Sequence, residues 1–187
     1  MPADDDAVDA RRVLAGDTDA FGGIVERWQG PLVNLAYRFC HDHGHAEDMA
    51  QEAFLKAYRS LASWRGEARF STWLFAIALN LYRSRVRRVE LPLVALDRVQ
   101  LVDEQRPEDA FEDRERDETV RRAVLKLPAK YRDATILYYF HDMDVAEAAA
   151  TLRVPTGTLK ARLSRGRDLL RKRLDRDEVR ARNSGDQ

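Results

Sequence analysis

The sequence has few of the residues that define several structural classes. It contains a single cysteine, Cys40, so no disulfide can form within the chain, and this fits a reducing compartment. Glycine (9) and proline (6) are scarce among 187 residues, and alternating stretches rich in Val, Ile and Thr are nearly absent. These scarcities disfavour a β-sheet domain and a disulfide-stabilised one, and they favour an all-helical chain.

Long apolar runs and a net charge are missing as well. The most apolar stretch, Trp73–Tyr82, is too short to cross a bilayer and contains Asn80. The first residues form neither a basic nor an apolar segment of a signal peptide. Because 32 Lys and Arg balance 32 Asp and Glu, only the distribution of charge is informative about partners. We expect a soluble cytoplasmic protein with no membrane insertion.

Motifs of catalysis are absent too. The chain has no phosphate-binding loop, no His-Glu-x-x-His and no paired nucleophile and base, so we expect that it is not an enzyme. Cys40, His41, His43 and His45 carry donors that suit zinc or a softer metal. Neighbours in one short loop cannot all converge on one ion, so we expect no metal and no cofactor. Metal sensing by this loop stays open as an alternative.

The first half of the chain shows helical periods. Residues 1–14 read as an acidic tail, and residues 1–9 are predicted to be disordered. Apolar residues then recur at helical spacing from Phe21, and Gly30-Pro31 predicts a break or kink. The clearest helix is Ala46–Leu61, which has one apolar and one charged face. Another helix begins at Phe70 or Ser71, has Trp73 on its apolar side, and ends near residue 88 in a cationic strip. We place the first domain at residues 15–88.

The second half follows an acidic segment. Residues 89–116 are predicted to be a solvated linker, residues 117–176 a second domain, and residues 177–187 a disordered tail. The predicted fold is therefore all-α, with two small helical domains joined by an acidic linker. The second domain is predicted to contain four helices, at Asp117–Lys126, Lys130–Phe140, Val145–Leu152 and Gly157–Leu174.

The last two of these helices predict a helix-turn-helix. They are joined by the tight turn Arg153-Val154-Pro155, and the second helix is strongly basic. Leu159 and Leu163 are predicted to be buried, whereas arginines on the other faces suit guanine edges and phosphates. We expect Thr156 to cap the helix and, with Thr158, to approach a phosphate. These features predict that the domain binds duplex DNA.

Three segments, in order, resemble the extracytoplasmic-function (ECF) group of the sigma-70 family. Residues 46–54 are similar to the helix that binds core RNA polymerase. Residues 70–74, with Asn80 downstream, are similar to the promoter-melting helix, and residues 127–163 are similar to the promoter-reading domain. The resemblance covers residues 15–88 and 115–174. It implies a sigma factor that binds core polymerase and directs promoter recognition and transcription initiation.

The resemblance also implies roles for individual residues. The positions that match polymerase-binding ones, directed at the β′ clamp helices, are Asp48, Gln51, Glu52 and Phe54. Those that match contacts to the −10 element, including a loop that takes a flipped base, are Trp64, Arg65, Arg69, Phe70, Asn80, Arg83 and Arg87. Those assigned to the −35 element are Thr156, Thr158, Lys160, Arg162, Ser164, Arg165 and Arg167. The implied partners are core RNA polymerase (β′ and β subunits), promoter DNA and an anti-sigma factor.

The chain departs from the family pattern at four positions, one of which is His141, where an acid is common. Ala76 stands where Arg is frequent, Ser84 where Asp is frequent, and Ala148 where Ile is usual. Ala76 and Ser84 lie eight residues apart on one helix face, which suggests that a charge pair is absent as a unit. The competing interpretation is a helix-turn-helix regulator that is not a polymerase subunit. Such a regulator would carry a ligand-binding or phospho-acceptor domain across residues 46–88.

Overall fold

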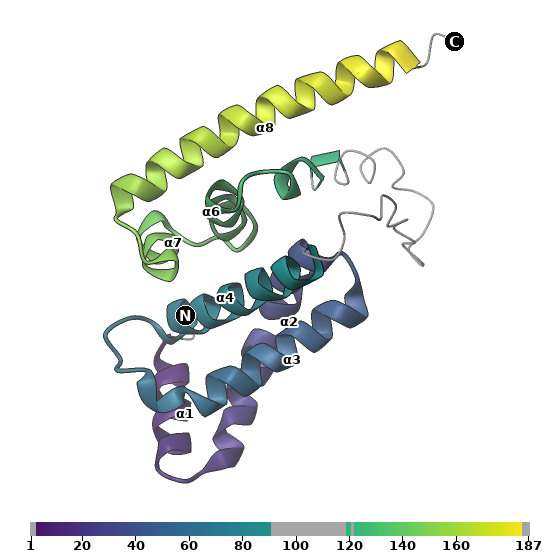
Figure 1. Ribbon diagram of the computed structural model, residues 1–187. Coiled ribbons are helices and arrows are strands. Elements are labelled where there is room, and N and C mark those ends of the chain that lie inside the picture. Colours follow the sequence, from purple (N-terminus) through teal and green to yellow (C-terminus); the bar gives the residue numbers. More distant parts are fainter. Residues whose placement is uncertain (1–2, 91–118, 121, 185–187) are drawn as a thin grey trace. The chain divides into compact units, whose positions relative to one another are not determined.

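The regular structure of the protein is helical wherever it is described. A computed structural model describes residues 3–90, 119–120 and 122–184, so most of the predicted linker at residues 89–116 lies outside the described residues (Figure 1). The chain divides into two units. The helices of the first are α1 (Ala3–Leu14), α2 (Phe21–Cys40), α3 (His43–Arg59) and α4 (Phe70–Glu90). Those of the second include α6 (Ala129–Phe140), most of α7 (Val145–Leu152) and α8 (Thr156–Ser184).

The predicted fold class is confirmed, because both units are helical and none of the described residues forms a strand. Two short 3-10 turns, η1 (Thr18–Ala20) and η2 (Leu61–Ser63), complete the first unit, and residues 119–120 and 122–125 are helical in the second. None of the described helices combines the length and the apolar character that a membrane span requires.

The acidic N-terminal segment is a packed helix from residue 3, so the prediction of a tail at residues 1–14 was wrong for residues 3–14. Asp6 is only 1% exposed and accepts hydrogen bonds from Arg27 Nε at 2.8 Å and from Trp28 Nε1 at 3.1 Å. Asp9 accepts a further bond from Arg27 Nη2 at 2.6 Å. Charge-assisted bonds of this kind satisfy the carboxylates inside the unit. The acidic residues therefore fix α1 to α2 instead of keeping it in solvent.

Helix α2 runs without interruption from Phe21 to Cys40. The break that was predicted as one possibility at Gly30-Pro31 does not occur. Gly23 has a packing role in its first turn. A Cβ at position 23 would lie 2.8 Å from Asp9 Oδ2, so any larger residue would force the Asp9 carboxylate, which is bound to Arg27, to move. His41 follows the last helical residue as the C-cap. Its left-handed φ of 56° stops the helical hydrogen bonding.

The core of the first unit lies where α2, α3 and α4 meet. Leu32 and Leu35 of α2 and Leu74 of α4 are fully buried. Tyr82 is also inaccessible; its hydroxyl donates to the Leu32 carbonyl at 3.3 Å, and burial raises the pKa of the phenol. Asp42 accepts a bond from the His45 amide at 2.7 Å and so caps the start of α3. The caps and the apolar stripes together set which faces of α3 and α4 are left to solvent.

The second unit places α6 against α8. Gly166 of α8 is buried there, and a Cβ at that position would lie 3.0 Å from Thr135 Oγ1. Ala148 and Ala149 of α7 are buried, so the small residue at position 148 lies in a packed place. A capping box begins α7: Asp144 accepts from the Glu147 amide at 2.8 Å, and Glu147 accepts from the Asp144 amide at 3.2 Å.

Helix α8 differs from its prediction at both ends. The Leu159 amide donates to the Pro155 carbonyl at 3.0 Å, so Thr156 is the first helical residue and not the cap. The helix continues to Ser184, so the prediction of a disordered tail at residues 177–187 was wrong as far as residue 184. The turn before it, residues 153–155, does connect α7 to α8 as predicted, with Arg153 at a left-handed φ of 54°.

Candidate nucleic-acid and polymerase interfaces

Helix α8 separates its apolar residues from its basic ones. Leu159 is 0% and Leu163 5% exposed, and together they hold the helix in the unit as predicted. The residues assigned to the −35 element lie away from this stripe. Arg162 is half-buried, and the others are exposed: Thr156, Thr158, Lys160, Ser164, Arg165 and Arg167. The described surface thus presents four cationic side chains along two turns of one helix.

An aromatic side chain from α6 joins this surface. Arg167 Nη1 donates to the Tyr139 hydroxyl at 3.1 Å, and this hydrogen bond raises the pKa of the guanidinium. Tyr139 is 43% exposed beside it. Sequence reasoning missed Tyr139, because α6 has a weak apolar period and nothing in its pattern marks which tyrosine faces α8.

The loop between η2 and α4 is ordered by its own tryptophan. Trp64 Nε1 donates to the Ala68 carbonyl at 3.1 Å, and the indole meets the ring of Phe70 edge to face at 5.4 Å. Gly66 has a φ of 76°, which allows the tight turn. Trp64 is half-buried and Arg65 is exposed. The loop therefore offers one aromatic face and a cationic rim.

Phe70 differs from the other residues predicted in this loop. It is 1% exposed, packed between Trp64 and Trp73, so it supports the loop from beneath and presents no surface to a strand. Its assignment as a direct DNA contact is corrected accordingly. Arg69 is exposed at the end of the loop, immediately before α4.

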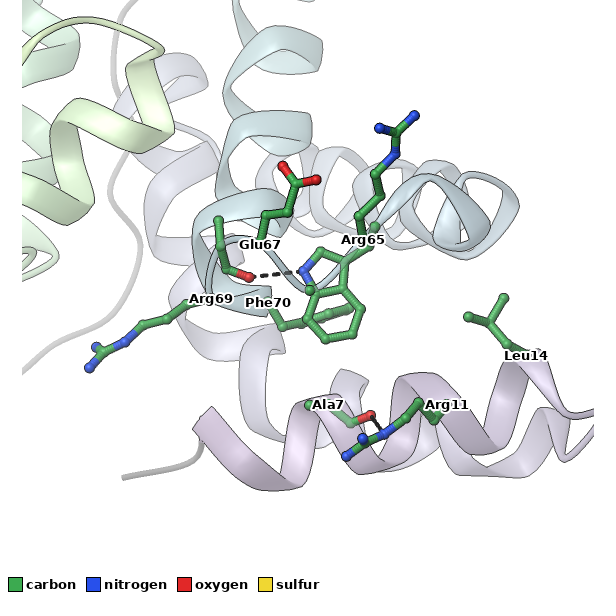
Figure 2. Close-up of a pocket in the computed structure, with 10 residues that line it drawn as sticks. Ala7, Arg11, Leu14, Arg65, Glu67, Arg69 and Phe70 are labelled. Carbon is green, nitrogen blue, oxygen red and sulfur yellow. Dashed lines mark hydrogen bonds between the residues drawn. The ribbon is translucent and has the colours of Figure 1, made fainter.

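A pocket of about 590 Å³ lies between this loop and α1. Figure 2 shows Ala7, Arg11 and Leu14 of α1 along one side and Arg65, Glu67, Arg69 and Phe70 along the other. Trp64 lines it as well. Sequence reasoning missed the contribution of α1, because it assigned residues 1–14 to an acidic tail.

Helix α4 exposes Asn80 on the same stripe as Trp73, seven residues earlier. Trp73 was expected in the core, but it is half-buried and lies 5.3 Å from the ring of Phe70. Arg83 is half-buried, and Arg87 lies within α4, although its side chain is outside the described part. The structure thus brings an amide and an aromatic ring to one face of α4.

Helix α3 carries the residues assigned to polymerase binding. Asp48 and Gln51 are exposed, and Glu52 is paired with Arg85 of α4, whose Nε lies 2.8 Å from Glu52 Oε2. Phe54 is 7% exposed and packs edge to face on Phe21, so its assignment as a contact residue is corrected to a core role.

Sequence reasoning missed the exposed apolar residue that lies among the α3 residues assigned to polymerase binding. Leu55 is 55% exposed, the most exposed large apolar residue described, and Tyr58 follows at 39%. Leu55 lies seven, four and three residues after Asp48, Gln51 and Glu52, so all four share one stripe of α3. That spacing was a signal that the sequence already contained.

The Cys40–His45 loop does not form a cluster. Tyr37 packs against the rings of His41 at 5.8 Å and His43 at 5.0 Å, whereas His45 Nδ1 lies 3.3 Å from Asp42. Burial raises the pKa of the Cys40 thiol. In the part of the chain that is described, no three His, Cys, Asp or Glu side chains are placed to hold a metal ion. The geometry gives the metal alternative no support.

Comparison with known proteins matches a different part of the sigma-70 family to each half of the chain. Residues 24–90 match the family Sigma-70 region 2, and residues 117–170 match Sigma-70, region 4. The ECF RNA polymerase sigma factor SigW of Bacillus subtilis (strain 168) is 39% identical over 176 residues, 88% of this chain and 94% of SigW.

Two solved structures are similar over most of their length. CnrH in complex with the cytosolic domain of CnrY has a TM-score of 0.71 at 26% identity, covering 92% of this chain and 99% of that one. The sigma factor RpoE of Bartonella quintana, in complex with the anti-sigma factor NepR, has a TM-score of 0.66 at 25% identity, covering 84% and 98%.

The chain belongs to the sigma-70 family, as an RNA polymerase sigma factor of the ECF type. The predicted function is thereby confirmed, and the alternative of a regulator that is not a polymerase subunit is not favoured. A sigma factor is a transcription initiation factor and not an enzyme, so that prediction is confirmed as well. The residues of α3, α4 and α8 described above are the candidates for its contacts.

Proposed function

We propose that this sigma factor places cytoplasmic core polymerase on promoters through two DNA contacts, one from each unit. The observation that carries the proposal is the surface of α8. Six of the seven residues assigned there are exposed, away from a stripe that buries Leu159 and Leu163. A helix held in this way can enter the major groove of a duplex with its cationic residues outward.

The second unit, which contains most of the domain predicted at residues 117–176, is assigned to the −35 duplex. Lys160, Arg162 and Arg165 are suited to phosphates and guanine edges, and Thr156 and Thr158 lie at the helix N-terminus, where backbone amides favour a phosphate. Arg167 is partly oriented by its bond to Tyr139. An oriented guanidinium loses less side-chain entropy when it binds DNA.

The first unit, which contains the domain predicted at residues 15–88, is assigned to the −10 element in its single-stranded form. Trp64 offers a face on which an unpaired base can stack, and Arg65 and Arg69 offer charge to the backbone. Asn80, with both a donor and an acceptor, can bond a base edge. Phe70 and Trp73 hold these groups in place from beneath.

The exposed stripe of α3 is assigned to core polymerase, through the β′ clamp helices. It combines the polar groups of Asp48, Gln51 and Glu52 with the exposed Leu55 at its centre. An apolar centre with a polar rim is the usual anatomy of a protein interface. Contact with the β subunit is assigned to the second unit.

A dedicated inhibitor is the remaining partner in this proposal. The similar sigma factor RpoE of Bartonella quintana is solved in complex with the anti-sigma factor NepR. We infer a cognate anti-sigma factor for this chain, which would occlude the same α3 and α8 surfaces.

The test is reconstitution. The full chain is mixed with sigma-free core polymerase, and run-off transcripts are collected from a library of genomic fragments. We expect co-elution with core and transcripts from a set of fragments that share two spaced elements. Absence of co-elution, or transcripts no different from those of core alone, would refute the proposal.

A further inference from the structure

The pocket beside the Trp64 loop has two sides, and only one of them belongs to the loop. Ala7, Arg11 and Leu14 of α1 form the other side (Figure 2). Its volume of about 590 Å³ lies within the range of small-ligand sites. Helix α1 precedes residues 24–90, which match region 2, so that match assigns it nothing.

The α1 side of the pocket is held in place by hydrogen bonds to α2. Asp6, 1% exposed, holds Arg27 and Trp28 of α2, and Asp9 holds Arg27 again at 2.6 Å. Charge-assisted bonds on a buried acid keep the helix in one register. Ala7 and Arg11, which belong to the same helix, are therefore placed on a rigid element.

Arg11 is the charged group of that side. It is exposed, and its Nε donates to the Ala7 carbonyl at 3.1 Å, which orients the guanidinium along α1. Among the described residues no carboxylate is paired with it, whereas the neighbouring Arg12 is bound to Asp17 at 2.7 Å. The charge of Arg11 is thus available to a ligand, and the charge of Arg12 is engaged.

The lining has the chemistry of a nucleotide site. Three arginines, Arg11, Arg65 and Arg69, stand against one carboxylate, Glu67, around a half-buried indole. Aromatic rings bind unpaired bases by stacking, and arginines bind the backbone phosphates.

We propose that α1 forms the second wall of the single-strand site and that Arg11 binds a phosphate next to the base captured beside Trp64. This inference rests on the function proposed above for the Trp64 loop. It adds a phosphate-binding residue that lies outside the stretches matched to regions 2 and 4, on a helix held by internal ion pairs.

The test measures salt dependence with the holoenzyme. Arg11→Gln and Arg12→Gln are matched variants, because each removes one exposed positive charge from the same helix. The probe is the single-stranded −10 segment of a promoter recovered by run-off transcription. We expect Arg11→Gln to weaken binding about 3- to 10-fold and to lower the slope of log K against log salt by about 0.7, as for one lost single-strand phosphate contact. Arg12→Gln is expected to change neither.

A Trp64→Ala variant separates the two proposals. If Trp64→Ala loses affinity while Arg11→Gln keeps the wild-type affinity and slope, the role of α1 is overturned and the loop assignment stands. If both variants bind as wild type, the single-strand site is overturned with it. Thermal unfolding of each variant shows whether α1 is still folded, so a loss of slope with an unchanged midpoint supports the direct contact.

Discussion

At the scale of single residues, the same side-chain type has opposite roles that composition does not separate. Asp48 is an exposed acid on α3, whereas Asp6 is buried and holds two donors of α2. In the nearby sequence both residues are acids in a charged segment. The partners of Asp6 lie 21 and 22 residues away, so a short stretch of sequence does not reveal them. The sequence therefore predicted the exposed acids correctly and misassigned the buried one.

Replacing Asp6 by Asn is expected to lower the free energy of unfolding by about 1.5–3 kcal/mol, the range for a hydrogen bond to a charged group. The amide keeps the size of the carboxylate but loses the charge that binds Arg27. Urea denaturation followed by circular dichroism measures the change. Asp5→Asn, on the exposed side of the same helix, is the control and is expected to stay within about 0.5 kcal/mol. Equal stability of the two variants would contradict an internal role for Asp6.

Leu55 gives a second prediction at this scale. Leu55→Ala is expected to raise the Kd for core polymerase about tenfold, corresponding to roughly 1.4 kcal/mol of lost apolar burial. Competition with a labelled wild-type chain measures the affinity. Val8→Ala removes an apolar side chain of comparable exposure from α1 and is expected to bind normally. Wild-type affinity of Leu55→Ala would remove Leu55 from the interface.

At the scale of elements, helical periodicity predicted the interior helices well. Val145–Leu152 has the predicted bounds, and α3, α4 and α6 differ from the predictions by a few residues at their ends. The failures are at the chain ends and at Gly30-Pro31, where long-range packing and continued helical hydrogen bonding outweigh local signals. The candidate sites follow this pattern: residues on α8 were predicted as a set, whereas α1 and Tyr139 enter only through tertiary contacts.

Gly166 tests the packing of α6 on α8. Gly166→Ala gains about 1 kcal/mol of helix propensity but forces a methyl to 3.0 Å from the buried Thr135 Oγ1, and overpacking costs about 1–3 kcal/mol. We expect a net loss of stability of about 1 kcal/mol in thermal unfolding. Thr135 Oγ1 has no hydrogen-bond partner among the described residues, so Thr135→Ala in the same chain is expected to restore stability. A double variant no more stable than Gly166→Ala would show that the contact is not the cause.

At the scale of the whole molecule, the two surfaces that we propose for DNA binding lie in different units and share no residue. Their assigned substrates differ as well, because α8 is suited to a duplex and the Trp64 loop to a single strand. Resemblance to a family predicted this division, which composition alone, with a net charge of zero, did not indicate.

This division predicts a separation of effects. In holoenzyme, Arg165→Gln is expected to weaken binding to duplex promoter and lower the salt slope by about 0.9, with no effect on a single-stranded −10 probe. Asn80→Ala is expected to weaken the single-stranded probe several-fold and leave closed duplex binding unchanged. Filter binding on both probes, with the double variant included, measures additivity. Equal losses on both probes for either variant would contradict the assignment to separate contacts.

Gly23 connects the interior of the first unit to its pocket. The Asp9 carboxylate of α1 occupies the space that a side chain at position 23 would take, and α1 carries one side of the pocket. A descendant of this chain that acquired a side chain there would have to displace Asp9 or the helix that bears it. The width of the pocket thus depends on a residue that does not line it. Related chains can differ in this site without any change in the loop.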